Sequence, residues 1–234
     1  MKGLILAASF ALTATTMLAA DTPDERLTSA SNVFTDVMAT PDKGIPQDLL
    51  NRAQCIVIVP DLKKAAFVVG GEYGRGFATC RNTSGSGWGA PAAVRIEGGS
   101  VGFQIGGSST DLILLVMNRA GMNRLLGDKF TLGADASVAA GPVGRTANAA
   151  RDVKMTAEIL AWSRSKGLFA GISLNGATLR PDTSENEKLY GKHLTNKEIL
   201  AGDVQPPAMA KPLITALDRY SARKSEGEAS RTAH

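Results

Sequence analysis

Basic side chains in turn-like stretches are the residues best suited to hold a ligand. An ammonium or guanidinium group near an anionic membrane contributes about 1 kcal/mol of attraction, so several are needed together. Each could equally be an ordinary solvated loop charge, and the sequence does not show whether the turns share one end of the fold. The candidate lipid contacts are Lys63, Lys64, Arg145, Arg164 and Lys166.

Cys55 and Cys80 are the only cysteines of the chain. If residues 55–59, 66–70 and 76–80 formed a simple three-strand meander, the two cysteines would lie two strands apart, about 9.6 Å. A disulfide needs Cα atoms within roughly 7 Å. The pair can therefore bond only if the first and third strands are neighbours, and the alternative is two buried thiols.

Histidine chemistry is poorly supported, because the chain has only His193 and the C-terminal His234. A histidine-based metal site or a Ser-His-Asp triad is therefore not expected. Ser163 and Lys166 match the SxxK pattern of serine acyl-enzymes. The accompanying SDN and KTG patterns are absent, and the match falls in an expected hairpin turn, so we reject it.

Carboxylates and glycine clusters also give no reaction centre. Asp111 and Asp135 flank apolar stretches and are expected to be buried, hydrogen-bonded structural groups. The glycine clusters at residues 70–76 and 98–102 contain no GxGxxG opening a helix and no GK[ST] ending. We expect a protein that is not an enzyme and that needs no cofactor or metal.

The first 20 residues have the pattern of a secretory signal peptide. Lys2 precedes an apolar run at residues 4–12, and small residues stand before Asp21. Its removal would lower the formal charge of the 234-residue chain from +4 to +3, since only one charged residue is lost. We expect export to a bacterial periplasm or secretion. The mild basic excess permits anionic partners without requiring them.

Helices are expected at both ends of the chain. Apolar residues at helical spacing after Thr22 predict a helix over Pro23–Ala39. Its polar face has no basic excess, which favours packing on the core over binding flat to a membrane. Shorter helices are expected after Pro46, over residues 183–190 and 195–202, and at residues 213–220.

About eight strands with short connections are expected between these helices. We expect Pro60 to end the first strand, Gly71-Glu72-Tyr73 and Gly98-Gly99 to form turns, and residues 130–140 to form one half-buried strand. The hairpin pattern at residues 165–176 is expected at the centre of the sheet. The fold class predicted is α+β, with a strongly bent or barrel-like antiparallel sheet and helices at the N- and C-terminal ends.

Several motifs in a fixed order resemble the SYLF domain family over residues 27–202. They are GGEYGRGFATCR at residues 70–81, WGAP at 88–91, GFQIGG at 102–107, TDLILLV at 110–116, AGPVGR at 140–145, SKGLFAGISLNG at 165–176 and YG at 190–191. The expected organisation is a signal peptide at residues 1–20, a SYLF-like domain at 21–202, and a linker, helix and polar tail at 203–234.

The resemblance implies lipid association, with phosphoinositides in eukaryotic members, and actin-filament binding in some of them. We therefore expect an exported, non-catalytic lipid-binding protein on anionic phospholipid membranes. The alternatives are a protein-interaction module, with actin as one candidate partner, and a carrier holding lipid inside a barrel. Nucleic-acid binding is not expected, because the basic residues are not interleaved with exposed aromatics.

Overall fold

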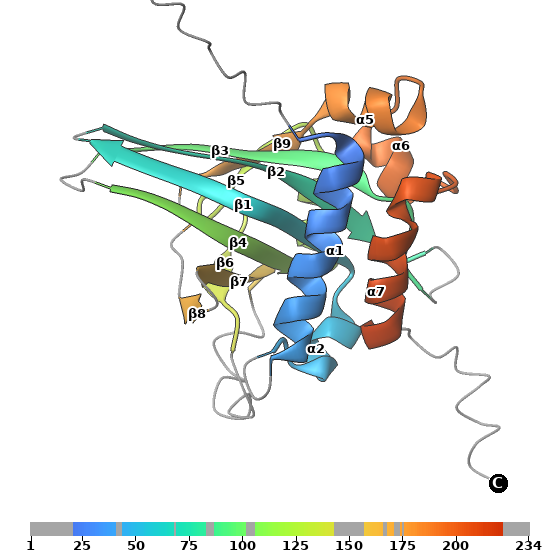
Figure 1. The fold of residues 1–234 in the computed structure, drawn as a ribbon, viewed down its shortest axis with the longest axis horizontal. Helices are drawn as coiled ribbons and strands as arrows, with labels where there is room; N and C mark the ends of the chain where they lie inside the picture. Colours follow the sequence, from blue (N-terminus) through green and yellow to red (C-terminus); the bar gives the residue numbers. More distant parts are fainter. Residues whose placement is uncertain are drawn as a thin grey trace, which may run out of the picture.

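Four long strands form the middle of a nine-stranded sheet in the computed structural model (Figure 1). The model describes residues 21–40, 44–67, 69–82, 87–101, 106–142, 157–165, 168–170, 174 and 176–221. The predicted signal peptide, Arg145 and Lys166 lie outside the described residues. The long strands are β1 (Cys55–Phe67), β2 (Val69–Cys80), β3 (Ala92–Val101) and β4 (Gly106–Val116).

Shorter strands extend the sheet on both sides and curl it. They are β5 (Phe130–Thr131), β6 (Val138–Ala140), β7 (Ile159–Ser165), β8 (Leu168–Ala170) and β9 (Thr178–Pro181). The strand order is β5-β9-β3-β2-β1-β4-β7-β6, and β8 pairs with β7. All pairs are antiparallel except β6 with β7. The predicted α+β class with a bent sheet is confirmed, with this one parallel pair added.

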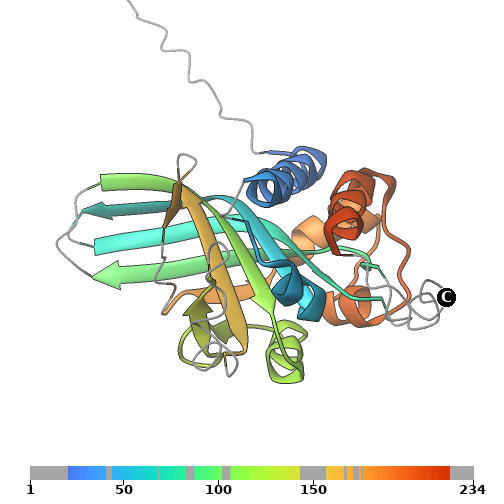
Figure 2. The same ribbon diagram turned by 90° about the horizontal axis from the view of Figure 1, so that it is seen from below.

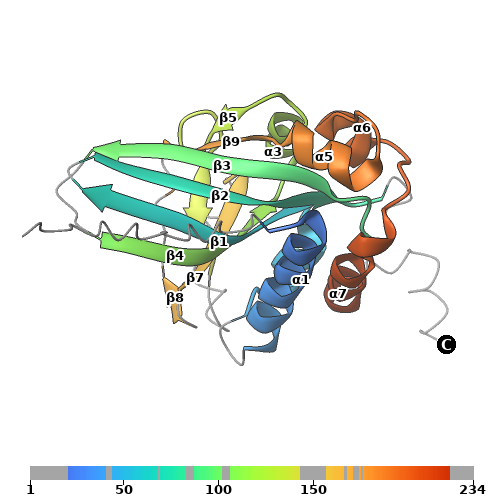
Figure 3. The same cartoon turned by 45° about the horizontal axis from the view of Figure 1, so that its top comes forward.

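Helices cover one end of the sheet and leave the other end of the four long strands projecting away from them (Figure 2). The helices are α1 (Pro23–Ala39), α2 (Gln47–Arg52), α3 (Arg119–Leu125), α5 (Thr183–Tyr190), α6 (Asn196–Ala201), the 3₁₀ turn η2 (Ala208–Ala210) and α7 (Lys211–Ser221). Helices α1 and α7 lie side by side, as Figures 1 and 3 both show. No described helix is long and apolar enough to cross a membrane.

Two hydrophobic clusters lie on the two faces of the sheet. Ile56 and Ile58 of β1 belong to the cluster that packs α1 and α7 against the sheet. Val57 and Val59 belong to the cluster inside the curl, with β5, α3 and α6. Because successive side chains of a strand point to opposite faces, β1 contributes alternate residues to the two clusters.

β1 continues through Pro60, which we expected to end it. Ile58 pairs with Phe77 of β2, but Lys63 pairs with Tyr73, so β1 carries one residue more than its partner. Asp61 adopts a left-handed conformation there, with φ 57°. This is a β-bulge, which tolerates a proline without an N–H to donate.

The bulge reverses the alternation of β1. Before it, even-numbered side chains face α1; after it, Leu62 belongs to the core inside the curl and Lys63 lines the α1 side. A one-residue insertion has this effect because the side-chain period is two. The orientation of the two predicted contacts Lys63 and Lys64 therefore depends on this bulge.

Three other strand predictions were wrong. The expected turns at residues 71–73 and 98–99 lie inside β2 and β3, where Gly71 pairs with Gly99. Residues 130–140 form two short strands, because Asp135 accepts the Thr131 N–H at 2.7 Å and closes a turn between them. The hairpin of β7 and β8 lies beside β4 toward one end of the sheet order instead of at its centre.

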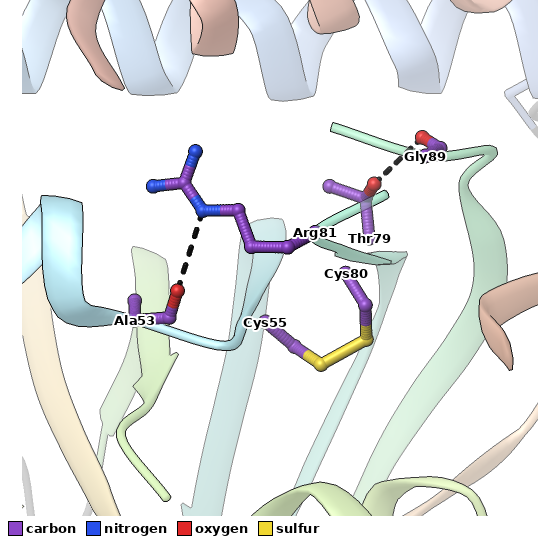
Figure 4. The surroundings of a disulfide bond; sticks show 6 residues. All are labelled: Ala53, Cys55, Thr79, Cys80, Arg81 and Gly89. Atoms are coloured by element: carbon purple, nitrogen blue, oxygen red, sulfur yellow. Dashed lines mark hydrogen bonds between the residues drawn. A yellow bond between two sulfur atoms is a disulfide. The ribbon is translucent and has the colours of Figure 1, made fainter. Parts of the chain in front are cut away.

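Cys55 and Cys80 form a disulfide inside the curl (Figure 4). They are direct cross-strand partners, and their Cα atoms lie 3.9 Å apart. Of the two alternatives left open, the disulfide is the one that forms, because residues 55–80 form one long hairpin instead of a three-strand meander. The neighbouring Arg81 donates its backbone N–H to the Gln54 carbonyl at 2.9 Å, which places the cysteines at a close, non-hydrogen-bonded position.

Candidate functional site

A groove of about 580 Å³ runs between α1 and the bend of the long strands. We call it the α1 groove. Helix α1 supplies one wall, the bulge of β1 and the adjoining part of β2 supply the other, and β4 and β7 contribute one residue each. The charged residues of its wall are Asp21, Arg26, Asp36, Asp61, Lys63, Arg75, Asp111 and Arg164.

Two of the five predicted contacts, Lys63 and Arg164, meet in this groove although they are far apart in sequence. Lys64 does not join them, because it faces the opposite side of the sheet and pairs with Glu72 at 2.6 Å. Arg145 and Lys166 lie outside the described residues. The groove therefore gathers part of the predicted basic set.

Arg164 is held by two carboxylates of the groove. Its guanidinium lies 3.1 Å from Asp36 on α1 and 3.3 Å from Asp111 on β4. Asp111 also accepts the backbone N–H of Asp61 at 3.2 Å. Asp111 is hydrogen-bonded, as expected, but it is only partly buried. Arg164 thus ties α1 to the bend of the sheet.

Tyr73 is the large hydrophobic residue that the described part of the chain leaves exposed, with 49% of its surface accessible. It is the cross-strand partner of Lys63 and lines the groove beside it. Within the described residues, Lys63 has no ion pair. An exposed aromatic next to an available cation is suited to contact with another molecule.

A buried ionic cluster joins two residues of the groove wall, Arg26 and Arg75, to the start of α5. Glu185 pairs with Arg26 of α1 and lies 2.9 Å from Arg75 of β2. Arg75 also pairs with Asp182 at 2.6 Å. The side chains of Glu185 and Asp182 are each 2% exposed, so their charges are stabilised by these arginines instead of by water. The cluster fixes α1, β2 and α5 relative to one another.

The pKa of Asp182 reflects two opposing effects, burial of the carboxyl and its contact with Arg75. Burial alone would raise the pKa of this carboxyl, but the hydrogen bond and charge of Arg75 outweigh burial and lower it. The same contact raises the pKa of Arg75 against the opposing effect of its own burial. Both side chains are therefore charged at neutral pH, and the cluster is structural in character.

Sequence reasoning missed Arg26, Arg75, Asp36 and Tyr73 as parts of the site. Asp36 and Arg26 were seen only as charges on the polar face of an expected helix. The signal for Arg75 and Tyr73 was their alternation in β2, which the wrongly expected turn at residues 71–73 concealed. With one uninterrupted strand, both would have been assigned to the α1 side.

The groove offers binding surface without a recognisable reaction centre. Among the described residues, no group of three or more histidine, cysteine, aspartate or glutamate side chains could hold a metal ion. Ser163, the serine of the rejected SxxK match, is 3% exposed and lies within the β7 ladder. The groove wall has both acidic and basic side chains, which suits a partner surface that also has charges of both signs.

The comparison with protein-family models gives a match over residues 97–220 to the family described as Ysc84: Las17-binding protein actin regulator. LAS seventeen-binding protein 3 of Saccharomyces cerevisiae is 36% identical over 191 residues, 80% of this chain and 41% of the relative. The human SH3 domain-containing YSC84-like protein 1 is 34% identical over 199 residues, 83% of this chain and 58% of the relative.

An SH3 domain-containing protein of Schizosaccharomyces pombe is 39% identical over 178 residues, 74% of this chain and 41% of the relative. The chain thus spans about half the length of the curated relatives it matches. The match over more than half of this chain agrees with the SYLF motifs of the sequence. The chain belongs to the Ysc84 family, the SYLF domain family that those motifs indicated.

Proposed function

We propose that the protein is a non-catalytic binding domain that engages a protein partner through the α1 groove. The observation that carries this proposal is the exposed Tyr73 beside Lys63, in a groove whose other cations are already paired with acids. Matched charges of both signs complement a protein surface better than a uniformly anionic one. The family description, which names Las17 binding and actin regulation, supports a partner of that kind.

A peripheral association with anionic phospholipid is the second candidate function. Lys63 and Tyr73 form a cation and aromatic pair on the exposed part of β1 and β2, a combination suited to a membrane interface. The pairing of Arg164 with Asp36 and Asp111, and of Lys64 with Glu72, reduces the cationic charge that a bilayer would meet. That is why we place the protein partner first.

Export is part of the proposal. The disulfide between Cys55 and Cys80 supports an oxidising compartment such as a periplasm or the extracellular space, because cytosolic thiols are kept reduced. The signal-peptide pattern of residues 1–20 supports the same compartment.

Co-sedimentation of the chain without residues 1–20 tests both candidates. Actin filaments represent the protein partner, and phosphatidylcholine vesicles with or without phosphatidylserine or phosphatidylinositol bisphosphate represent the membrane. We expect binding to filaments, weakened in Lys63→Gln and Tyr73→Ala. Lys64→Gln is the matched control, because it removes the same charge from the opposite face.

Binding to anionic vesicles without binding to filaments would replace the protein partner with the membrane. Equal effects of Lys63→Gln and Lys64→Gln would remove the α1 groove as the binding surface. Binding to neither probe would overturn both candidates.

A further inference from the structure

Among the described residues, one edge of β3 has no partner strand over its last four residues. β9 pairs with residues 94–97 of β3, and the last pair joins Glu97 to Thr178. β3 continues to Val101 and keeps its pairing with β2 throughout. Within the described part of the chain, no strand pairs with residues 98–101 on the side where β9 would continue.

The residues just before β9 make backbone hydrogen bonds on the side of β5. The Leu132 N–H donates to the Ala177 carbonyl at 2.8 Å, and the Gly176 N–H donates to the Leu132 carbonyl at 2.9 Å. Gly176 has a positive φ of 89°, which lets the backbone turn toward Leu132. Among the described residues, the N–H groups of Gly176 and Ala177 thus donate to Leu132 and Leu174, and neither donates to β3.

The register identifies the backbone groups that face this edge. Ala93 accepts the Asp182 N–H at 3.0 Å and donates its own N–H to the Asn186 side chain, so its polar groups face the β9 side. Alternate residues of a strand face the same side, and the ladders of β3 have no register shift. The N–H and C=O groups of Gly99 and Val101 therefore face the open edge.

Nothing in residues 98–101 blocks an added strand. The stretch Gly-Gly-Ser-Val has no proline, no charge and no bulge, the devices that usually protect an edge. A Cβ placed on Gly99 would lie 4.0 Å from the nearest atom of the described residues outside its own chain neighbours, the Gly70 carbonyl oxygen. The backbone of another chain can approach closely here.

A cavity of about 530 Å³ lies at this edge, and its wall has charged side chains of both signs. Gly98 and Gly99 line it together with Lys129 and Arg180. The acids in its wall are engaged: Glu97 pairs with Arg180 at 3.2 Å, and Glu72 pairs with Lys64 at 2.6 Å. Asp135, the third acid of the wall, accepts the Thr131 N–H at 2.7 Å. Lys129 has no carboxylate partner among the described residues.

We propose that residues 98–101 of β3 accept an extended peptide segment as an added strand, and that Lys129 selects a segment with an acidic side chain. The main-chain bonds of Gly99 and Val101 supply general affinity, as in other cases of strand addition. Lys129, which has no carboxylate partner among the described residues, supplies the preference for an acidic side chain. This surface is separate from the α1 groove, so the proposal stands independently of the function proposed above.

The test uses the chain without residues 1–20 and a synthetic peptide of alternating valine and threonine with a glutamate at each end. We expect binding by calorimetry, with slower amide hydrogen exchange at Gly99 and Val101. The same peptide with terminal glutamines should bind more weakly. Lys129→Gln should weaken binding of the glutamate peptide about two- to fivefold, the range of an exposed ion pair. Lys197→Gln on α6 removes the same charge elsewhere and should have no effect.

Backbone bonding is tested from the peptide side, which leaves the protein unchanged. Methylation of the peptide nitrogens that would face β3 should abolish binding, whereas methylation of the alternate nitrogens should not. Equal binding of both methylated peptides, or of glutamate and glutamine peptides, would overturn the proposal. Protection of Gly99 that increases with protein concentration without peptide would instead assign the edge to a second copy of this chain.

Discussion

Asp61 donates its backbone N–H to the Asp111 side chain at 3.2 Å, a bond that fastens the bulge of β1 to the neighbouring strand β4. Asp111 also holds Arg164 at 3.3 Å, so the same carboxylate joins the bend of the sheet to the ion pair that reaches α1. The bulge directs Lys63 toward α1. A change that disrupts the bulge should therefore also change the wall of the α1 groove.

Asp111→Ala should lower the free energy of unfolding by about 1–3 kcal/mol, because the Asp61 N–H and Arg164 both lose an acceptor. Urea unfolding followed by circular dichroism measures the change. Asp128→Ala, at an exposed position, is the control and should change stability little. Equal stability of the two variants would show that the bulge does not depend on this carboxylate.

Gly76→Ala should be strongly destabilising because the bend of β1 passes directly over this glycine. A Cβ at Gly76 would lie 2.0 Å from the Ile58 carbonyl oxygen and 2.7 Å from the Val59 Cα. Backbone would have to move, at a cost of about 3 kcal/mol or more. A Cβ at Gly71 on the same strand would lie 3.8 Å from the Gly98 carbonyl oxygen, an ordinary contact, so Gly71→Ala should be close to neutral. A thermal unfolding comparison in which both variants melt alike would contradict this account.

The helices were predictable because their signals are local. Thr22 and Glu25 form a capping box at the start of α1, and Thr195 and Glu198 form another at α6. Helix bounds followed from these residues and from apolar spacing. The fold class followed in turn from helices at both ends of a strand-rich middle.

Strand lengths were not predictable in the same way. Pro60 and the glycine pairs normally end strands, and a single sequence does not show that a partner strand has the matching residues. Gly71 lies opposite Gly99, and the bend at Pro60 fits over Gly74 and Gly76. Each apparent break is thus compensated by a residue on another strand, and the α1 groove depends on those pairings.

Replacing both Cys55 and Cys80 with alanine should lower the free energy of unfolding by about 3 kcal/mol, because the disulfide closes a loop with a sequence separation of 25. Denaturant unfolding of the oxidised protein and of the double variant measures this difference in the free energy of unfolding. Both cysteines are buried, so a mild reductant should act slowly on the folded protein. A reduced protein as stable as the oxidised one would contradict a structural role for the bond.

The buried cluster at α5 predicts how stability depends on pH. The pKa of Asp182 is lowered in the folded protein, since Arg75 outweighs the effect of burial. An aspartate is ordinarily half protonated near about pH 3.9, and folding shifts that midpoint downward. The stabilisation is therefore fully present above the ordinary pKa and is lost as pH falls from about 4 through the lowered value.

Asp182→Asn should lower stability at neutral pH by about 3 kcal/mol, because Arg75 loses one of its two buried carboxylates. It should also flatten the acid limb of the stability curve, since asparagine has no proton to gain. Urea unfolding at a series of pH values between neutrality and acid measures both effects. Asp128→Asn is the matched control at an exposed position. An acid limb as steep in Asp182→Asn as in the unchanged protein would mean that other carboxylates govern its acid unfolding.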